Sequence, residues 1–129
     1  MEIKTHRKIN RELCGEPIKV EEGYAEVELR TTELMAADEK GLIHGGFIFG
    51  QADYAAMLAV NHPNVVLGAA NVMFLKPVKV GDTVVAVARV TSESGKKRIV
   101  EVSVKRGNEE VFKGEFICFV LDKHVLERS

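Results

Sequence analysis

The chain has no tryptophan, only three prolines and two cysteines, and no marked excess of either charge among its 129 residues. Cys14 and Cys118 are too few and too far apart for a disulfide framework, so we expect two small, reduced core residues. Eighteen basic side chains against 19 acidic ones leave no overall field for nucleic acid or for an anionic membrane. An anionic ligand would need a local basic patch.

The sequence also lacks an apolar leader and an uninterrupted transmembrane run. Its first ten residues, MEIKTHRKIN, are polar, so we expect a cytoplasmic protein. Residues 54–75 contain no Asp, Glu, Lys or Arg, but the turn-forming residues 61–64 divide them into a helix and a strand. We therefore expect no membrane partner. The length fits a single domain over residues 1–129.

Hydrophobic periodicity predicts one long helix and five strands. Residues 23–30 alternate between apolar and polar side chains, which is typical of a half-buried strand. Residues 31–43 have no sustained period and predict a loop with one helical turn near residues 33–36. Residues 45–60 predict a helix of about four turns that Pro63 stops. Four further strands are expected to form an antiparallel meander, at residues 65–75, 83–92, 97–105 and 111–121.

Asp53 interrupts a helix that is otherwise apolar on nearly every side. A helix of this kind is buried, and burial of an uncompensated carboxylate is costly and raises its pKa. Such a carboxylate is a candidate general base or nucleophile. The residues leave a second interpretation open, in which Asp53 bonds a backbone amide or a partner side chain and only fixes packing.

His44, Gly45 and Gly46 stand at the start of this helix. Two glycines allow a ligand to approach the main chain, and the first N–H groups of a helix lie at the positive end of its dipole without intrahelical acceptors. Donors held in this way can stabilise an oxyanion. A plain glycine-rich turn into a helix is the alternative.

Gly45 and Asp53 cannot serve one reacting group from a single helix. Eight residues separate them, which corresponds to about 12 Å along the helix axis, whereas reacting atoms lie within about 3–3.5 Å. They therefore act separately, or the donors of one subunit meet the carboxylate of another. Residues 83–90 and 116–121 are apolar on both faces, which also suggests that a second subunit covers part of the sheet.

Other chemistries find little support in the sequence. The four histidines and Asp53 show no metal-ligand spacing, and no CxxC, GxSxG or Walker-type motif occurs. The chain has neither net basic charge nor a helix-turn-helix pattern. We therefore predict no metal site and no nucleic-acid partner.

The stretch from His44 to Asp53 resembles the PaaI-like acyl-CoA thioesterases of the hotdog superfamily, in which a carboxylate follows the histidine by nine positions. The family's strand-turn-strand signature has counterparts in residues 74–77 and in Gly81 and Asp82. Its glycine-lysine hairpin resembles residues 94–97. The resemblance extends from residue 17 to residue 121.

This resemblance implies an α+β hotdog fold, in which a curved antiparallel sheet of five or six strands wraps one long helix. It implies dimers joined edge to edge through their sheets, and often tetramers made of two dimers. It also implies that Gly45, next to Gly46, offers its amide to the thioester carbonyl while Asp53 of the partner subunit activates water or attacks directly. His44 would mainly position the loop. Coenzyme A enters as part of the substrate, so we expect no separate cofactor.

Several further residues are candidates for substrate binding. Asp38 stands where many members of that family have asparagine, and it would position or repel an anionic acyl group. Asn71 either faces the site or makes a hydrogen bond at the sheet edge. Lys96 and Lys97 form either a phosphate-facing patch or plain solvated surface. The candidates for lining an acyl pocket, which core packing explains equally well, are Phe47, Phe49, Tyr54, Met57 and Phe74.

We therefore predict a hydrolase that converts a small or medium acyl-CoA, aromatic or aliphatic, into free acid and CoA. The alternative is a non-catalytic acyl-CoA-binding module, because fatty-acid-synthesis repressors use a hotdog domain with a similar turn to sense malonyl-CoA. A dehydratase or hydratase on the same fold is the third hypothesis. That chemistry usually needs a differently placed pair of histidine and acid, which the sequence does not present convincingly.

Overall fold

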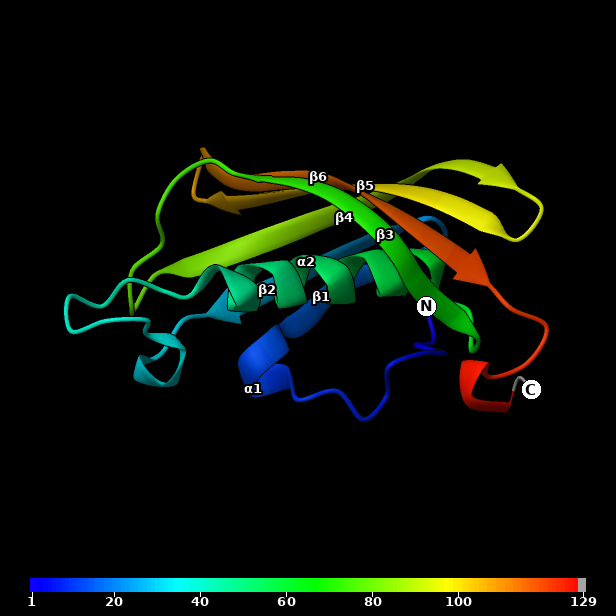
Figure 1. Cartoon of the computed structure of the whole chain (residues 1–129), viewed down its shortest axis with the longest axis horizontal. Helices are drawn as coiled ribbons and strands as arrows, with labels where there is room; N and C mark the ends of the chain where they lie inside the picture. Colours follow the sequence, from blue (N-terminus) through cyan, green and yellow to red (C-terminus); the bar gives the residue numbers. More distant parts are fainter. Residues whose placement is uncertain (128–129) are drawn as a thin grey trace.

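One long helix and a six-stranded antiparallel sheet dominate residues 1–127, the part of the chain that the computed structural model describes. The sheet curves around the helix α2 (Gly45–Val60), as Figure 1 shows. This confirms the predicted α+β hotdog fold. The other elements are α1 (Arg11–Cys14), β1 (Glu16–Glu21), β2 (Tyr24–Arg30), the 3-10 turn η1 (Glu33–Met35), β3 (Val65–Phe74), β4 (Thr83–Ser94), β5 (Lys97–Arg106), β6 (Glu109–Val120) and the 3-10 turn η2 (Val125–Glu127).

The helix α2 spans the predicted residues because the sequence marks both of its ends. His44 is extended at its start, with φ −62° and ψ 128°. Asn61 ends the helix in the left-handed conformation, at φ 51°, and donates its N–H to the carbonyl of Met57 at 2.8 Å. Asparagine adopts this conformation more readily than most residues, and Pro63 cannot continue a helix. No helix within residues 1–127 is long and apolar enough to cross a membrane.

The sequence did not predict the short helix α1 or the edge strand β1. β1 reads EPIKVE and is mostly exposed, so it lacks the clear alternation that marks a half-buried strand. It pairs with β2 around an irregularity between Pro17 and Lys19. Proline and charged side chains are common in edge strands, because the outer side of the strand needs no partner and must not attract one.

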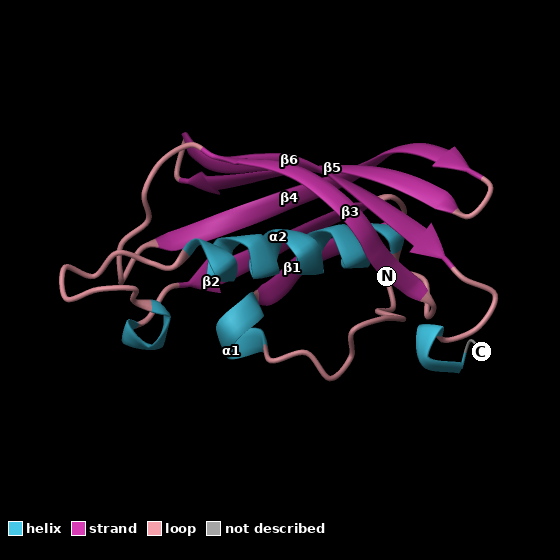
Figure 2. Ribbon diagram, in the orientation of Figure 1, coloured by secondary structure: helices cyan, strands magenta, loops and turns pink. Residues whose placement is uncertain are grey.

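The strand order β1-β2-β4-β5-β6-β3 corrects the predicted meander of four strands. β4, β5 and β6 follow one another as expected, but β3 pairs with β6 and not with β4. Residues 75–82 therefore carry the chain from the outer edge of the sheet to its middle. Figure 2 shows this long connection above the start of α2. The two edges of the sheet are β1 and β3.

The core lies between α2 and the concave face of the sheet. Leu58, Val84 and Phe116 are fully buried there, and burial of each such side chain contributes about 1.5–3 kcal/mol. Gln51 is buried among them, and its Nε2 donates to the carbonyl oxygens of Val27 and Val84, both at 3.0 Å. These two hydrogen bonds join the helix to β2 and β4 and hold α2 at a defined distance from the sheet.

Candidate active site

The start of α2 presents backbone donors to a pocket. Among residues 1–127 the amides of Gly45 and Gly46 have no hydrogen-bond acceptor, whereas the amide of Phe47 donates to the carbonyl of His44 at 3.1 Å. These amides lie at the positive end of the helix dipole. Gly45 lines a pocket of about 350 Å³.

Aromatic rings lie over the two glycines and leave little room for larger residues there. A Cβ atom on Gly45 would stand 2.9 Å from Cε1 of Phe74, and one on Gly46 would stand 2.8 Å from Nε2 of His44. The His44 ring is exposed and meets Phe47 edge-on, with the ring centroids 6.1 Å apart. His44 therefore packs against the helix start, as a loop-positioning residue would.

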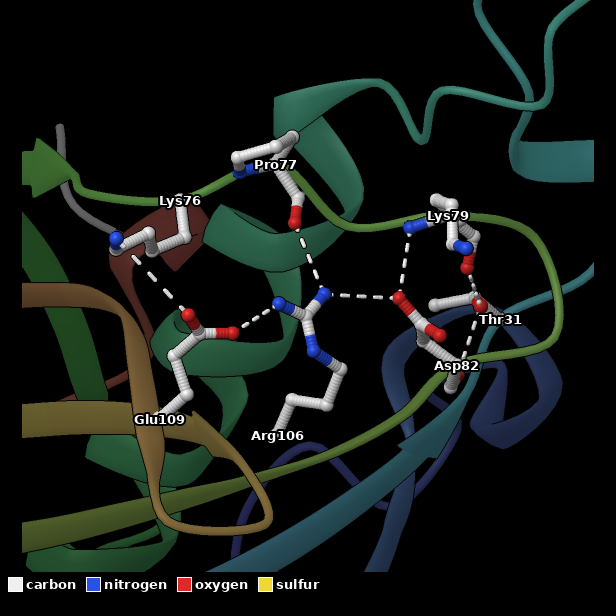
Figure 3. Close-up of polar contacts among 7 residues, drawn as sticks. All are labelled: Thr31, Lys76, Pro77, Lys79, Asp82, Arg106 and Glu109. Carbon is white, nitrogen blue, oxygen red and sulfur yellow. Dashed lines mark hydrogen bonds and ion pairs between the residues drawn. The ribbon is translucent and has the colours of Figure 1, made fainter.

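A hydrogen-bonded frame holds the wall of the pocket opposite the helix. Figure 3 shows Arg106 at the centre of this frame, where its Nη1 donates to the carbonyl of Pro77 and to Oδ2 of Asp82, both at 2.9 Å. Thr31 donates its hydroxyl to the carbonyls of Lys79 and Asp82. Asp82 also accepts from the amide of Lys79, and this hydrogen bond, with the Arg106 guanidinium, lowers the pKa of the Asp82 carboxyl.

Asp53 is the acidic residue that interrupts the apolar helix α2, and its carboxyl group is largely buried, as the sequence predicted. Its Oδ1 atom is buried and has no hydrogen-bond partner among residues 1–127. Burial raises the pKa of Asp53 to about 6. At neutral pH the carboxylate is therefore largely ionised yet poorly solvated, which makes it a stronger base than a surface aspartate.

The two cysteines flank the same carboxylate and are poor nucleophiles. Burial, reinforced by the charge of Asp53, raises the pKa of Cys118 to about 12 and also raises the pKa of Cys14. A thiol with a raised pKa carries little thiolate at neutral pH. Both thiols are free, as predicted; Cys118 is fully buried and Cys14 is half-buried.

Gly45 and Asp53 do not converge within one chain. The helix between them is continuous, so the rise of an α-helix keeps them about 12 Å apart along its axis. One chain therefore supplies two half-sites, the amides at the start of the helix and the carboxylate near its middle.

Two other predicted residues, Asn71 and Tyr54, do not line the pocket beside Gly45. Asn71 points to the convex face, because its neighbours Val72 and Phe74 face the helix side with Phe112 and Phe116. A role of Asn71 in substrate binding stays a prediction. Tyr54 is buried in the core, in line with the core-packing alternative for this residue, and its ring centroid lies 6.5 Å from that of His6.

The remaining candidates lie on the surface. Asp38 accepts hydrogen bonds from the amides of Lys40 and Leu42, so its carboxylate stabilises its own loop. Lys96 and Lys97 are exposed in the β4–β5 hairpin, and Lys96 pairs with Asp122 at 3.0 Å. Figure 1 places this yellow hairpin at the far end of the molecule from the start of α2, so one chain does not bring the lysines to its own Gly45.

No sequence pattern marks Arg106 as the centre of the frame. Its partners come from the β3–β4 connection and from the β5–β6 hairpin, so only the tertiary structure brings them together. Among the described residues, no group of three or more His, Cys, Asp or Glu side chains is placed to hold a metal ion.

Comparison with known proteins identifies relatives of this chain. The family model described as the thioesterase superfamily matches residues 40–113. A protein of Aquifex aeolicus named methylthioribose-1-phosphate isomerase is 62% identical over 123 residues, which are 95% of this chain and 27% of that protein. The transcription factor FapR of Caldanaerobacter subterraneus is 34% identical over 121 residues, which are 93% of this chain and 60% of FapR. The chain thus spans less than two thirds of either relative.

Solved structures share the whole architecture. The protein PH1136 of Pyrococcus horikoshii is 61% identical, with a TM-score of 0.97 and 98% of each chain covered. The PaaI protein of E. coli, from the phenylacetic acid degradation operon, is 25% identical, with a TM-score of 0.79 over 87% of this chain and 83% of that one.

Proposed function

Because this chain belongs to the thioesterase superfamily, we propose that it hydrolyses acyl-CoA thioesters to a free acid and CoA, in the manner of PaaI-like enzymes. The observation that carries the proposal is the buried carboxylate of Asp53, which has an unpaired Oδ1 atom and a pKa of about 6. A packing role within its own chain would require a hydrogen-bond partner for this atom there. A catalytic base requires an open lone pair.

The chemistry divides between the two half-sites. The amides at the start of α2 donate hydrogen bonds to the thioester oxygen and stabilise the negative charge that it gains when the carbonyl carbon is attacked. The Asp53 carboxylate removes a proton from water as the water oxygen bonds to that carbon. In the alternative route the carboxylate attacks the carbon itself, and water then hydrolyses the resulting mixed anhydride to the free acid and the free carboxylate. Collapse of the tetrahedral intermediate breaks the C–S bond, and the CoA sulfur leaves as a thiolate that takes up a proton. Both routes need Asp53 ionised.

A dimer supplies the second half-site. Met73 and Phe74, near the end of the edge strand β3, are 55% and 57% exposed, and the residues 68–71 before them are exposed and mostly small. An exposed apolar edge strand is a template for pairing with another chain. Antiparallel pairing of β3 with β3 of a second copy gives a two-fold dimer with one continuous sheet. In that dimer, Asp53 of the partner subunit faces the Gly45 amide across the interface.

The test is replacement of Asp53 by asparagine, which keeps its shape and removes its charge. We expect kcat to fall by a factor of about 10²–10⁴ on every acyl-CoA that the unmodified protein hydrolyses, measured by thiol release. The matched control is Glu22→Gln in the exposed β1–β2 turn, which removes one charge far from the pocket. Unchanged turnover in Asp53→Asn would refute the catalytic role.

The similarity to FapR favours a second candidate, a module that binds acyl-CoA without hydrolysing it. Tight binding of acyl-CoA by the unmodified protein, with no release of thiol over the same panel, would support this function. Turnover that Asp53→Asn abolishes would exclude it.

A further inference from the structure

We propose that the pocket beside Gly45 holds the acyl group, that this group is an uncharged hydrocarbon, and that Phe74 limits its size. This inference rests on the proposed function and names its substrate class.

The pocket walls are almost entirely apolar. Ile43 and Val78 are buried in the wall formed by the loop and the β3–β4 connection, Ile48 belongs to α2, and Val111 belongs to β6. The backbone amide of Gly45 is at the same pocket, so a thioester oxygen bound there would direct the attached carbon chain along these walls. An apolar group buried there is stabilised in proportion to its area.

Two cations near the pocket, Lys76 and Arg106, already have carboxylate partners. Lys76, at the rim, has its Nζ atom 4.0 Å from Oε2 of Glu109. Arg106 donates to the Pro77 carbonyl and pairs with Asp82 and Glu109, as Figure 3 shows. A carboxylate at the end of an acyl group would lose its hydration here without gaining a cation of its own. The pocket therefore disfavours dicarboxylic acyl groups.

The Arg106 frame fixes one wall through hydrogen bonds, whereas only packing contacts hold the Phe74 ring. Residues 75–82 are fixed through Arg106 and through the hydrogen bond from the Ile43 amide to the Val78 carbonyl at 2.8 Å. Phe74 is 57% exposed and packs against Phe112, with the ring centroids 5.1 Å apart. Because its ring also lies over Gly45, Phe74 is the side chain that a larger acyl group must displace.

The volume of about 350 Å³ sets the size class. It lies at the low end of the range of about 300–1,000 Å³ that is usual for small-molecule sites. The pocket therefore suits a short or medium hydrocarbon chain or a single aromatic ring.

The experiment compares Phe74→Ala with Met73→Ala, its neighbour on β3. Met73 is nearly as exposed but faces the convex side of the sheet, so it controls for any effect on the edge strand. The probes are non-hydrolysable CoA thioethers with hydrocarbon tails of increasing length, one with a phenyl tail and one with a carboxylate tail. Dissociation constants for all three proteins are measured by calorimetry, and kcat/KM is measured for the matching thioesters.

The unmodified protein should bind the medium hydrocarbon and phenyl probes at least tenfold more tightly than the carboxylate probe. Phe74→Ala should improve the affinity for the longest tail relative to the shortest by at least tenfold, while Met73→Ala leaves that ratio unchanged. Equal length profiles in all three proteins, or preference for the carboxylate probe, would overturn the inference. If the probes bind as expected but no thioester is hydrolysed, the result supports the acyl pocket and refutes the proposed hydrolysis.

Discussion

The Phe74 ring lies over Gly45 so closely that its Cε1 atom is 2.9 Å from the place of a Cβ atom. Replacing Gly45 by alanine therefore forces the ring to turn away, and this cost disappears when Phe74 is also alanine. We expect a coupling of about 0.5–1 kcal/mol between Gly45→Ala and Phe74→Ala in the free energy of unfolding. Urea denaturation at one fixed protein concentration measures it.

Gly50 is the control for that cycle, since a Cβ atom there meets nothing within 4 Å. Gly50→Ala should stabilise the protein by about 0.5–1 kcal/mol through helix propensity, with no coupling to Phe74→Ala. Equal coupling at Gly45 and Gly50 would show that the ring does not restrict position 45.

The rate of hydrolysis should depend on the ionisation of Asp53. Because burial raises the pKa of Asp53 to about 6, its active ionised form is lost as the pH falls through that value. We expect kcat/KM to rise with pH and reach half of its plateau near pH 6, a feature that should vanish from the residual activity of Asp53→Asn. A flat profile between pH 5 and pH 8 would contradict this assignment.

The same raised pKa predicts that Asp53 destabilises the fold at neutral pH. The ionised carboxylate is favoured in the unfolded chain, where its pKa is about 3.8, so the penalty begins above that pH and is complete above about pH 6. Asp53→Asn should therefore raise the free energy of unfolding at pH 7.5 by about 1–3 kcal/mol. The gain should disappear below about pH 4; a variant that is less stable than the parent at pH 7.5 would argue for a structural role.

Arg106 should matter more for stability than an exposed arginine does. Arg106→Ala removes charge-assisted hydrogen bonds to the Pro77 carbonyl and to Asp82, and we expect a loss of about 1 kcal/mol. Arg30→Ala should cost less than about 0.5 kcal/mol, because Arg30 is 83% exposed and lies 3.8 Å from Glu28. Thermal unfolding at pH 7.5 measures the stability of both variants. Equal losses of stability would show that the hydrogen bonds of Arg106 do not stabilise the fold.

The sequence predicted elements whose patterns are local. The bounds of α2 followed from the glycine pair before it and from Asn61 and Pro63 after it, and Asp53 stood out as a charge among apolar neighbours. β1 was missed because a polar edge strand has little hydrophobic signal. The order of the strands was missed because the side-chain pattern of a strand does not specify which strands it pairs with.

The geometry of the site was less accessible from the sequence. The face of Asn71 depends on a register shift in β3 between Leu67 and Ala69, which the side-chain pattern does not reveal. The contact of Phe74 with Gly45 and the contacts of Arg106 join segments far apart in sequence. Such contacts form only when the sheet closes around the helix. Secondary-structure propensity and hydrophobic periodicity therefore do not predict them.

Mixed dimers test whether Gly45 of one subunit works with Asp53 of the other. Gly45→Pro removes the amide hydrogen at a helix position that accepts proline, after an extended His44, and Gly45→Ala controls for the added bulk. Gly45→Pro and Asp53→Asn should each be inactive alone.

The decisive measurement is the thiol-release rate after the two inactive variants are unfolded together in equal amounts and refolded. Half of the dimers are then mixed, and each mixed dimer holds one intact site of two, so a shared site restores about a quarter of the parent activity. If each chain carried its own complete site, the mixture would stay as inactive as its components.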